Sequence, residues 1–177
     1  MKYKFQSWQK QKGTIPVLWT DADYTVKTTW RSHGNKYKGF TAPSEMFEIY
    51  NNNIGVLIPE SVLPIFDQVI EFFDLNNLVC DLSKYTPGMI LPWHTDDYPT
   101  YSKNMGVTDI ADIVRVIVFL HDSQPGHQLW IEDRFCSGRA GSWFSWEGKT
   151  KHMAANLGET DRYVIQLTGT KKINKLG

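Results

Sequence analysis

Short hydrophobic runs, rich in β-branched and aromatic residues, fill the second half of the chain, and turns containing glycine and aspartate separate them. This pattern is typical of the strands in a β sandwich or barrel. It predicts six strands: Leu78–Thr86, Asp112–His121, Gln128–Asp133, Gly141–Trp146, His152–Asn156 and Arg162–Thr168.

The earlier part of the chain carries helical signals. Pro43 opens one predicted helical segment, which extends to Tyr50. A second hydrophobic set recurs at helical spacing, namely Val62, Ile65, Phe66, Val69, Phe72 and Phe73. We expect these hydrophobic faces to pack on one side of the sheet.

Composition narrows the possible classes. A chain of 177 residues with 41% hydrophobic content is long enough for one buried core, so we expect a single domain, 1–177. Lysine and arginine number 19, as do aspartate and glutamate, so no overall charge attracts nucleic acid or an anionic membrane.

Other features indicate a soluble protein. The first twelve residues are too polar for a secretory signal, and no later run is long enough to span a membrane. Cys80 and Cys136, the two cysteines, are too few for a disulfide framework. We therefore expect an intracellular, cytoplasmic protein.

A metal site is the first chemical feature that the sequence suggests. His94 and Asp96 are two residues apart, so in an extended chain their side chains face the same side. A histidine from a distant strand is the usual third ligand, and His152 is the best candidate. Two imidazole nitrogens and one carboxylate suit ferrous iron, with coordination positions left open for a co-substrate and dioxygen.

A basic residue follows the third proposed ligand. Arg162 lies ten residues after His152 and opens an alternating run in which Arg162, Val164 and Gln166 share a face. If that face lines the barrel, the buried cation needs a partner. A bound dicarboxylate would supply one through a bidentate pair, and a carboxylate of the protein itself is the alternative.

These residues resemble the pattern of the iron(II)- and 2-oxoglutarate-dependent oxygenases, which is H-x-D, a distal histidine and a basic residue about ten positions later. The upstream spacing of Tyr85 and Gly88 before His94 is similar to the prolyl 4-hydroxylase branch, where the tyrosine contacts oxoglutarate. That branch usually has lysine where this chain has Arg162. Its G-G-x-T-x-F segment is replaced here by residues 126–130, so prolyl specificity is not carried over.

The resemblance implies a mainly β fold with flanking helices, the double-stranded β-helix or cupin-like jelly roll. The jelly-roll core would span 78–170, with helical and irregular support over 1–77. It also implies hydroxylation of a peptide, amino acid or small molecule, with Fe(II), 2-oxoglutarate and O₂, yielding succinate and CO₂. Arg162 and Tyr85 would hold the oxoglutarate.

Four residues are candidates for substrate contact, each with a structural alternative. Arg115, in an otherwise apolar strand, would bind an acidic substrate group or the oxoglutarate, or form an internal ion pair. Tyr98 and Tyr101 lie in the aperiodic segment 97–110, our candidate lid, and would touch substrate or anchor that segment. Trp130 would line the pocket or belong to the core.

Two other classes of function compete with the oxygenase. A cupin-like metalloprotein that does not use 2-oxoglutarate would need the three metal ligands but no Arg162 in the pocket. A catalytically silent β domain would bind no iron. The sequence does not identify the substrate or the oligomeric state.

Overall fold

The computed structural model describes residues 11–16, 27–33 and 53–171. Its strands pair antiparallel in two sheets. The large sheet has the order β1 (Gln11–Thr14), β9 (Ser142–Glu147), β6 (Ile113–Phe119), β11 (Arg162–Thr170), β4 (Asn76–Tyr85), β3 (Gly55–Pro59) and β2 (Thr28–Ser32). The small sheet has the order β5 (Ile90–His94), β10 (His152–Asn156), β7 (His127–Ile131) and β8 (Arg134–Phe135).

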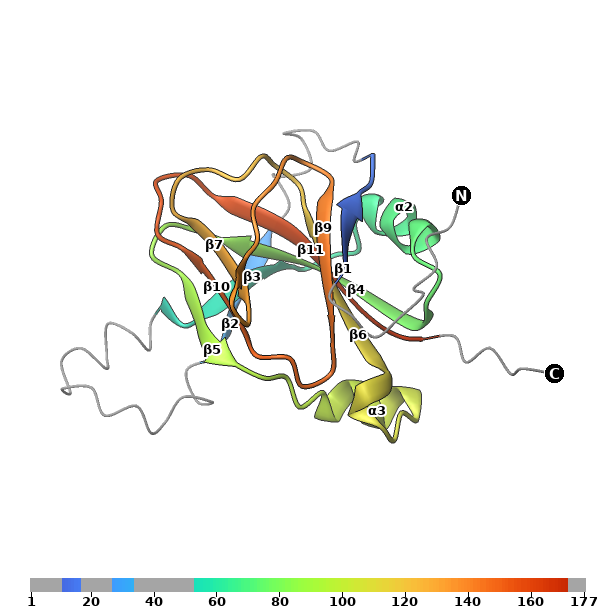
Figure 1. The fold of residues 1–177 in the computed structure, drawn as a ribbon. Helices are drawn as coiled ribbons and strands as arrows, with labels where there is room; N and C mark the ends of the chain where they lie inside the picture. Colours follow the sequence, from blue (N-terminus) through green and yellow to red (C-terminus); the bar gives the residue numbers. More distant parts are fainter. Residues whose placement is uncertain (1–10, 17–26, 34–52, 172–177) are drawn as a thin grey trace, which may run out of the picture.

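The two faces of the large sheet bury different clusters of hydrophobic residues. On one face, helix α2 (Ile65–Phe72) packs over Val116 and Ile165. On the other face, Ile117 and Val164 pack with Leu129 of the small sheet. In Figure 1 the small sheet and α2 accordingly lie on opposite sides of the large sheet. This arrangement confirms the predicted mainly β, jelly-roll fold class.

All six predicted strands are present, with ends that differ from the prediction by at most two residues. The helix predicted from the periodicity between residues 62 and 73 is present as α2, but Val62 precedes the helix and is 82% exposed. The predicted helix between residues 43 and 50 lies outside the described residues.

The expectation that residues 1–77 are only helical and irregular is wrong, because β1, β2 and β3 join the large sheet. These strands have four or five residues each, and β1 and β2 are largely polar edge strands. Strand β5 was also missed, because Pro92 interrupts its pattern. An edge strand tolerates proline, since one row of its backbone groups has no partner in the sheet.

Two further findings concern the exclusions drawn from the sequence. Among the described residues, no helix is long and apolar enough to cross a membrane. No disulfide joins Cys80 and Cys136.

Candidate metal centre

The three predicted metal ligands meet between the two sheets. His94 ends β5 and His152 begins β10, and the two residues are directly opposite each other in the small sheet. Asp96 follows β5 after one intervening residue. One donor atom from each of the three side chains lies within 4.8 Å of the others, which is close enough to hold one metal ion.

Backbone carbonyls orient both imidazole rings. Nδ1 of His94 lies 2.6 Å from the carbonyl oxygen of Pro92, and Nδ1 of His152 lies 2.9 Å from that of Thr150. A carbonyl oxygen only accepts hydrogen bonds, so each Nδ1 carries the proton and each Nε2 keeps its lone pair. Each Nε2 lies 3.7 Å from a carboxylate oxygen of Asp96. Such hydrogen bonds fix the ring orientation that metal-binding histidines require.

The protonation states suit a cation as well. Burial and the neighbouring His94 lower the pKa of His152 to about 4, although Asp96 opposes this shift. Burial alone would raise the pKa of the Asp96 carboxyl, but Arg115 and the two imidazoles outweigh burial and lower it to about 2. At neutral pH the site therefore offers a neutral imidazole from His152 and an ionised carboxylate.

Arg115 is part of this site through Asp96. It projects from β6 into the space between the sheets, and its Nη2 donates to Oδ2 of Asp96 at 2.8 Å. Its guanidinium also lies 5.0 Å from the ring centre of Tyr98. Of the two roles expected for Arg115, the internal ion pair is therefore present in the structure.

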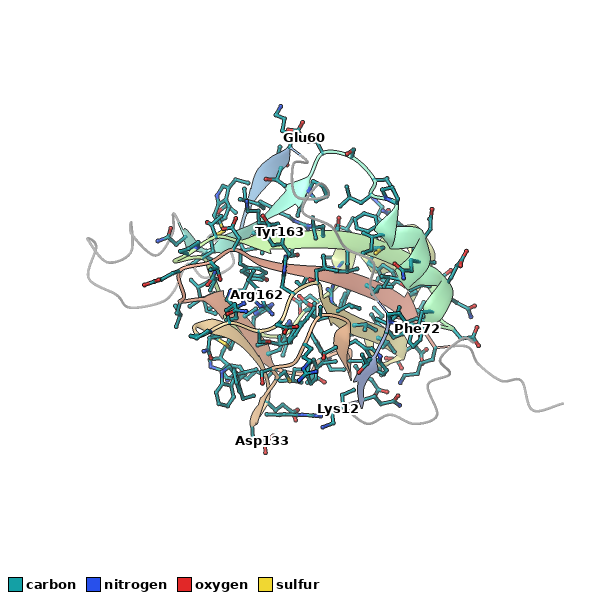
Figure 2. The ribbon with its side chains drawn as sticks, turned by 90° about the horizontal axis from the view of Figure 1, so that it is seen from above. Lys12, Glu60, Phe72, Asp133, Arg162 and Tyr163 are labelled. Atoms are coloured by element: carbon teal, nitrogen blue, oxygen red, sulfur yellow. The ribbon has the colours of Figure 1, made fainter. Side chains whose placement is uncertain are left out.

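Arg162 is the second buried arginine of the same region. It is 4% exposed, and neither Nη1 nor Nη2 has a hydrogen-bond partner among the described residues. The guanidinium lies 5.1 Å from the ring centre of Tyr85 and 5.6 Å from that of Phe119. Figure 2 shows Arg162 on the inner side of β11, whereas its neighbour Tyr163 packs in the cluster beneath α2.

One cavity connects the metal ligands with both arginines. Its volume is about 420 Å³, within the range of small-molecule sites. Every residue predicted for the site except Trp130 lines it: Tyr85, His94, Asp96, Tyr98, Tyr101, Arg115, His152 and Arg162.

Trp130 is not among the residues that line this cavity, so the structure gives no support to its predicted contact with substrate. Leu129 and Ile131 of β7 face the buried interior, and Trp130 lies on the opposite face of the strand. There its ring packs 5.2 Å from that of Phe135, and its Nε1 donates to Gln128. Trp146 is the one tryptophan among the described residues that lines the cavity, and its ring lies 4.7 Å from that of His152.

The aperiodic segment 97–110 contains the helix α3 (Pro99–Met105), which lies beyond the end of β6 in Figure 1. Tyr98 precedes the helix with a left-handed φ of 48°, a conformation that is costly for a residue with a side chain. Its buried ring packs on Arg115, which compensates for that cost. Tyr101 lines the cavity while its hydroxyl donates to the carbonyl of Asn77 at 2.9 Å. The lid role of this segment stays a prediction.

Gly88, part of the upstream motif, has a structural reason for being glycine. It lies in the turn between β4 and β5 with a positive φ of 88°, which side chains disfavour. Its backbone N–H donates to the carbonyl of Asn156 at 2.8 Å. The turn brings Tyr85 on β4 and His94 on β5 to the same interior.

Sequence reasoning missed two features of the site. The ion pair of Arg115 with Asp96 joins residues 19 positions apart, one on β6 of the large sheet and one just after β5 of the small sheet. No local sequence pattern predicts it. Asp81 lines the cavity from β4, and here a signal existed. Asp81 and Tyr85 occupy alternating positions of one predicted strand, so a site at Tyr85 implies that Asp81 faces it too.

Comparisons with known proteins give distant likenesses only. No protein-family model matches the chain, and the search of curated proteins found no match. Among solved structures, a prolyl-4-hydroxylase from Pseudomonas putida has 14% identity and a TM-score of 0.49, covering 86% of this chain and 96% of that one. A predicted oxalate decarboxylase from Thermotoga maritima has 10% identity and a TM-score of 0.47, covering 84% and 96%.

A third solved structure is the non-heme alpha-ketoglutarate-dependent carbocyclase SnoK from nogalamycin biosynthesis. Its identity is 15% and its TM-score 0.42, covering 52% of this chain and 48% of that one. The three proteins have different activities by name, so likenesses this distant do not identify the activity of this chain.

Proposed function

We propose that this chain is an Fe(II)- and 2-oxoglutarate-dependent dioxygenase that hydroxylates a peptide, amino acid or small molecule. The observation that carries the proposal is that the guanidinium of Arg162 is buried without a counter-ion among the described residues. Its buried terminal nitrogens lack partners among the described residues, and they belong to the cavity that the His94, Asp96 and His152 ligands also line.

The chemistry of Arg162 favours a carboxylate ligand. Burial lowers its pKa, and the nearby Tyr85 hydroxyl, which can accept a hydrogen bond from the guanidinium, opposes that shift. An arginine remains charged at neutral pH, and the Tyr85 hydroxyl is not a counter-ion. A buried charge without a counter-ion is unfavourable, and a carboxylate binds a guanidinium through two parallel hydrogen bonds. Burial raises the pKa of Tyr85 to about 12, so its hydroxyl stays protonated and can donate to the same ligand.

The metal ligands support iron as the partner of that ligand. Two imidazoles and one carboxylate on one side of a metal ion form the set typical of ferrous oxygenases, with the other positions open. When bound there, iron supplies the oxidising chemistry together with oxoglutarate and oxygen. The chain holds the ligands, anchors the distal carboxylate at Arg162, and limits water with the apolar walls formed by Leu129, Val164 and Trp146.

Succinate release tests this function. The full-length protein, given ferrous iron and 2-oxoglutarate under air, should release succinate slowly, even before its substrate is identified. We expect His94→Ala and Arg162→Met to abolish release, because the first removes a metal ligand and the second the carboxylate anchor. Arg139→Met is the matched control, since Arg139 is exposed and does not line the cavity.

Two outcomes would contradict the proposed function. Succinate release that persists unchanged in His94→Ala would show that the metal ligands are not its source. Tight iron binding by the wild type, without binding of oxoglutarate and without succinate release, would favour the cupin-like metalloprotein that does not use 2-oxoglutarate.

A further inference from the structure

The inner face of the large sheet carries a second pair of polar groups beyond the Arg162 end. Gln166 of β11 lies directly opposite Asp81 of β4, and both line the cavity. Gln166 is four residues from Arg162 on the same strand, which corresponds to about 13 Å in an extended chain. Val164 separates the two positions on β11 and lies opposite Ser83 of β4, so the pair of Asp81 and Gln166 is separate from the Arg162 end of the cavity.

Neither the Asp81 nor the Gln166 side chain has a hydrogen bond or ion pair within the described part of the chain. Both side chains are half-buried. Burial raises the pKa of Asp81, and the attraction of Arg31 and Arg115 only partly offsets that effect. A half-buried carboxylate without a hydrogen-bonding partner is unfavourable, and a bound cation would relieve that cost.

The nearby arginines do not supply that cation. Arg115 already donates to Asp96 at 2.8 Å. Arg31, on β2, lines the same cavity and attracts Asp81, but it is exposed and forms no salt bridge with Asp81. An ionised Asp81 acts only as a hydrogen-bond acceptor, and the amide oxygen of Gln166 adds a neutral acceptor at the same place.

We propose that this end of the cavity binds a cationic nitrogen of the substrate, an ammonium or guanidinium group, with Asp81 as its counter-ion and Gln166 as a second acceptor. The inference rests on the proposed function, because it names the substrate class of the same site. Arg162 and Asp81 have opposite charges, so the anionic co-substrate would bind at the Arg162 end of the cavity and the cationic group of the substrate at the Asp81 end.

Paired probes that differ only in side-chain charge test this inference. N-acetyl-arginine amide and N-acetyl-citrulline amide have similar shapes and uncharged backbones, but only the first is a cation. We would titrate each into the full-length protein without iron or oxoglutarate, using calorimetry or ligand-observed NMR. The wild type should bind the arginine probe about tenfold more tightly or better, the effect of one charge-assisted hydrogen bond.

Asp81→Asn should remove that preference, because it keeps the shape of the side chain and deletes the charge. Glu159→Gln is the matched control, since Glu159 is exposed and lies outside the cavity lining, and it should keep the wild-type preference. Thermal unfolding of both variants checks that they are folded. The lysine and norleucine amides form a second pair, and a preference for lysine that needs Asp81 supports the inference equally.

Several outcomes would overturn the inference. These are equal binding of the charged and neutral probes, a preference that survives in Asp81→Asn, no binding of either cationic probe, or tightest binding of N-acetyl-glutamate amide. Because these titrations contain no iron or oxoglutarate, they do not depend on the oxygenase proposal. Cation binding that needs Asp81, together with failure of the succinate assay, would reject the oxygenase and keep the cation site.

Discussion

Arg115 and Arg162 project from neighbouring strands of the large sheet into the same cavity, and both are buried, with exposures of 8% and 4%. Arg115 donates to Asp96, whereas both terminal nitrogens of Arg162 lack partners among the described residues. Arg115 also has a buried Nε without a partner, but its charge is balanced. Burial therefore does not distinguish the two arginines. Whether a buried arginine has a carboxylate partner indicates whether its role is structural or in binding.

The two environments predict opposite responses to loss of charge. Removing one member of a buried ion pair leaves the other charge uncompensated, which strongly destabilises a protein. Removing a buried cation that has no counter-ion relieves a cost instead. Arg115 should therefore contribute to the fold, and Arg162 should contribute to binding.

The largest effect on stability should come from Arg115→Met. Loss of the guanidinium leaves the Asp96 carboxylate beside two imidazoles without its main counter-ion. We expect the free energy of unfolding of the metal-free protein to fall by about 3 kcal/mol, measured by urea denaturation. Unchanged stability would mean that the ion pair contributes nothing and that the contrast with Arg162 is wrong.

Acid should lower the stability of the metal-free protein, because His152 is held neutral in the folded state. The pKa of His152 is about 4 in the folded protein, below its ordinary value of 6.5, so the unfolded chain takes up the proton more readily. The stability of the metal-free protein should then be constant above about pH 6.5 and should fall by about 3 kcal/mol as the pH drops to 4. Asp96, with a pKa of about 2, loses its contribution only at lower pH.

His152→Gln is the control for this pH dependence. Urea denaturation between pH 7 and pH 4 should give a flatter profile for this variant than for the wild type. An equally steep decline in both proteins would assign the acid sensitivity to another group.

Arg162→Met should give a smaller effect of opposite sign. An unbranched apolar side chain replaces a cation with no counter-ion, so the ligand-free protein should be unchanged or more stable by about 1 kcal/mol. Thermal unfolding without oxoglutarate measures this effect, with Arg139→Met as the exposed control. Destabilisation of more than about 1 kcal/mol would indicate a structural role for Arg162.

The tyrosines beside the two arginines give the finest comparison. Tyr85→Phe keeps the ring against Arg162 but removes the hydroxyl, which should weaken oxoglutarate binding about fivefold, the effect of one hydrogen bond. Tyr98→Phe, the matching change beside Arg115, should leave oxoglutarate affinity within about twofold. Equal losses in both variants would remove the distinction between Arg115 and Arg162.

The sequence predicted those parts of the fold and site that depend on local periodicity and spacing. The runs that form β6 and β11 are long and rich in β-branched residues, so their patterns were clear. The pair His94 and Asp96 was visible because two ligands on one short segment share a side. Arg162 was visible from its alternation with Val164.

Features that depend on tertiary pairing could not be predicted in the same way. The ion pair between Arg115 and Asp96 requires β6 to lie beside the segment after β5, and no spacing encodes that placement. Trp130 was assigned to the pocket from its residue type, but the facing of β7 decides where it points. Strands β1 and β2 are short and polar, so their patterns resemble loops until a neighbouring strand pairs with them.

An anaerobic titration of 2-oxoglutarate into the iron-loaded protein tests most directly whether Arg162 serves as a carboxylate anchor. It needs neither turnover nor a known substrate, and it compares the wild type with Arg162→Met and Arg139→Met. We predict saturable binding to the wild type and to Arg139→Met, and affinity at least about 100-fold weaker in Arg162→Met, as expected when a charge-assisted bidentate pair is lost. No binding to the iron-loaded wild type, or equal binding to wild type and Arg162→Met, would contradict the role of Arg162 as the anchor.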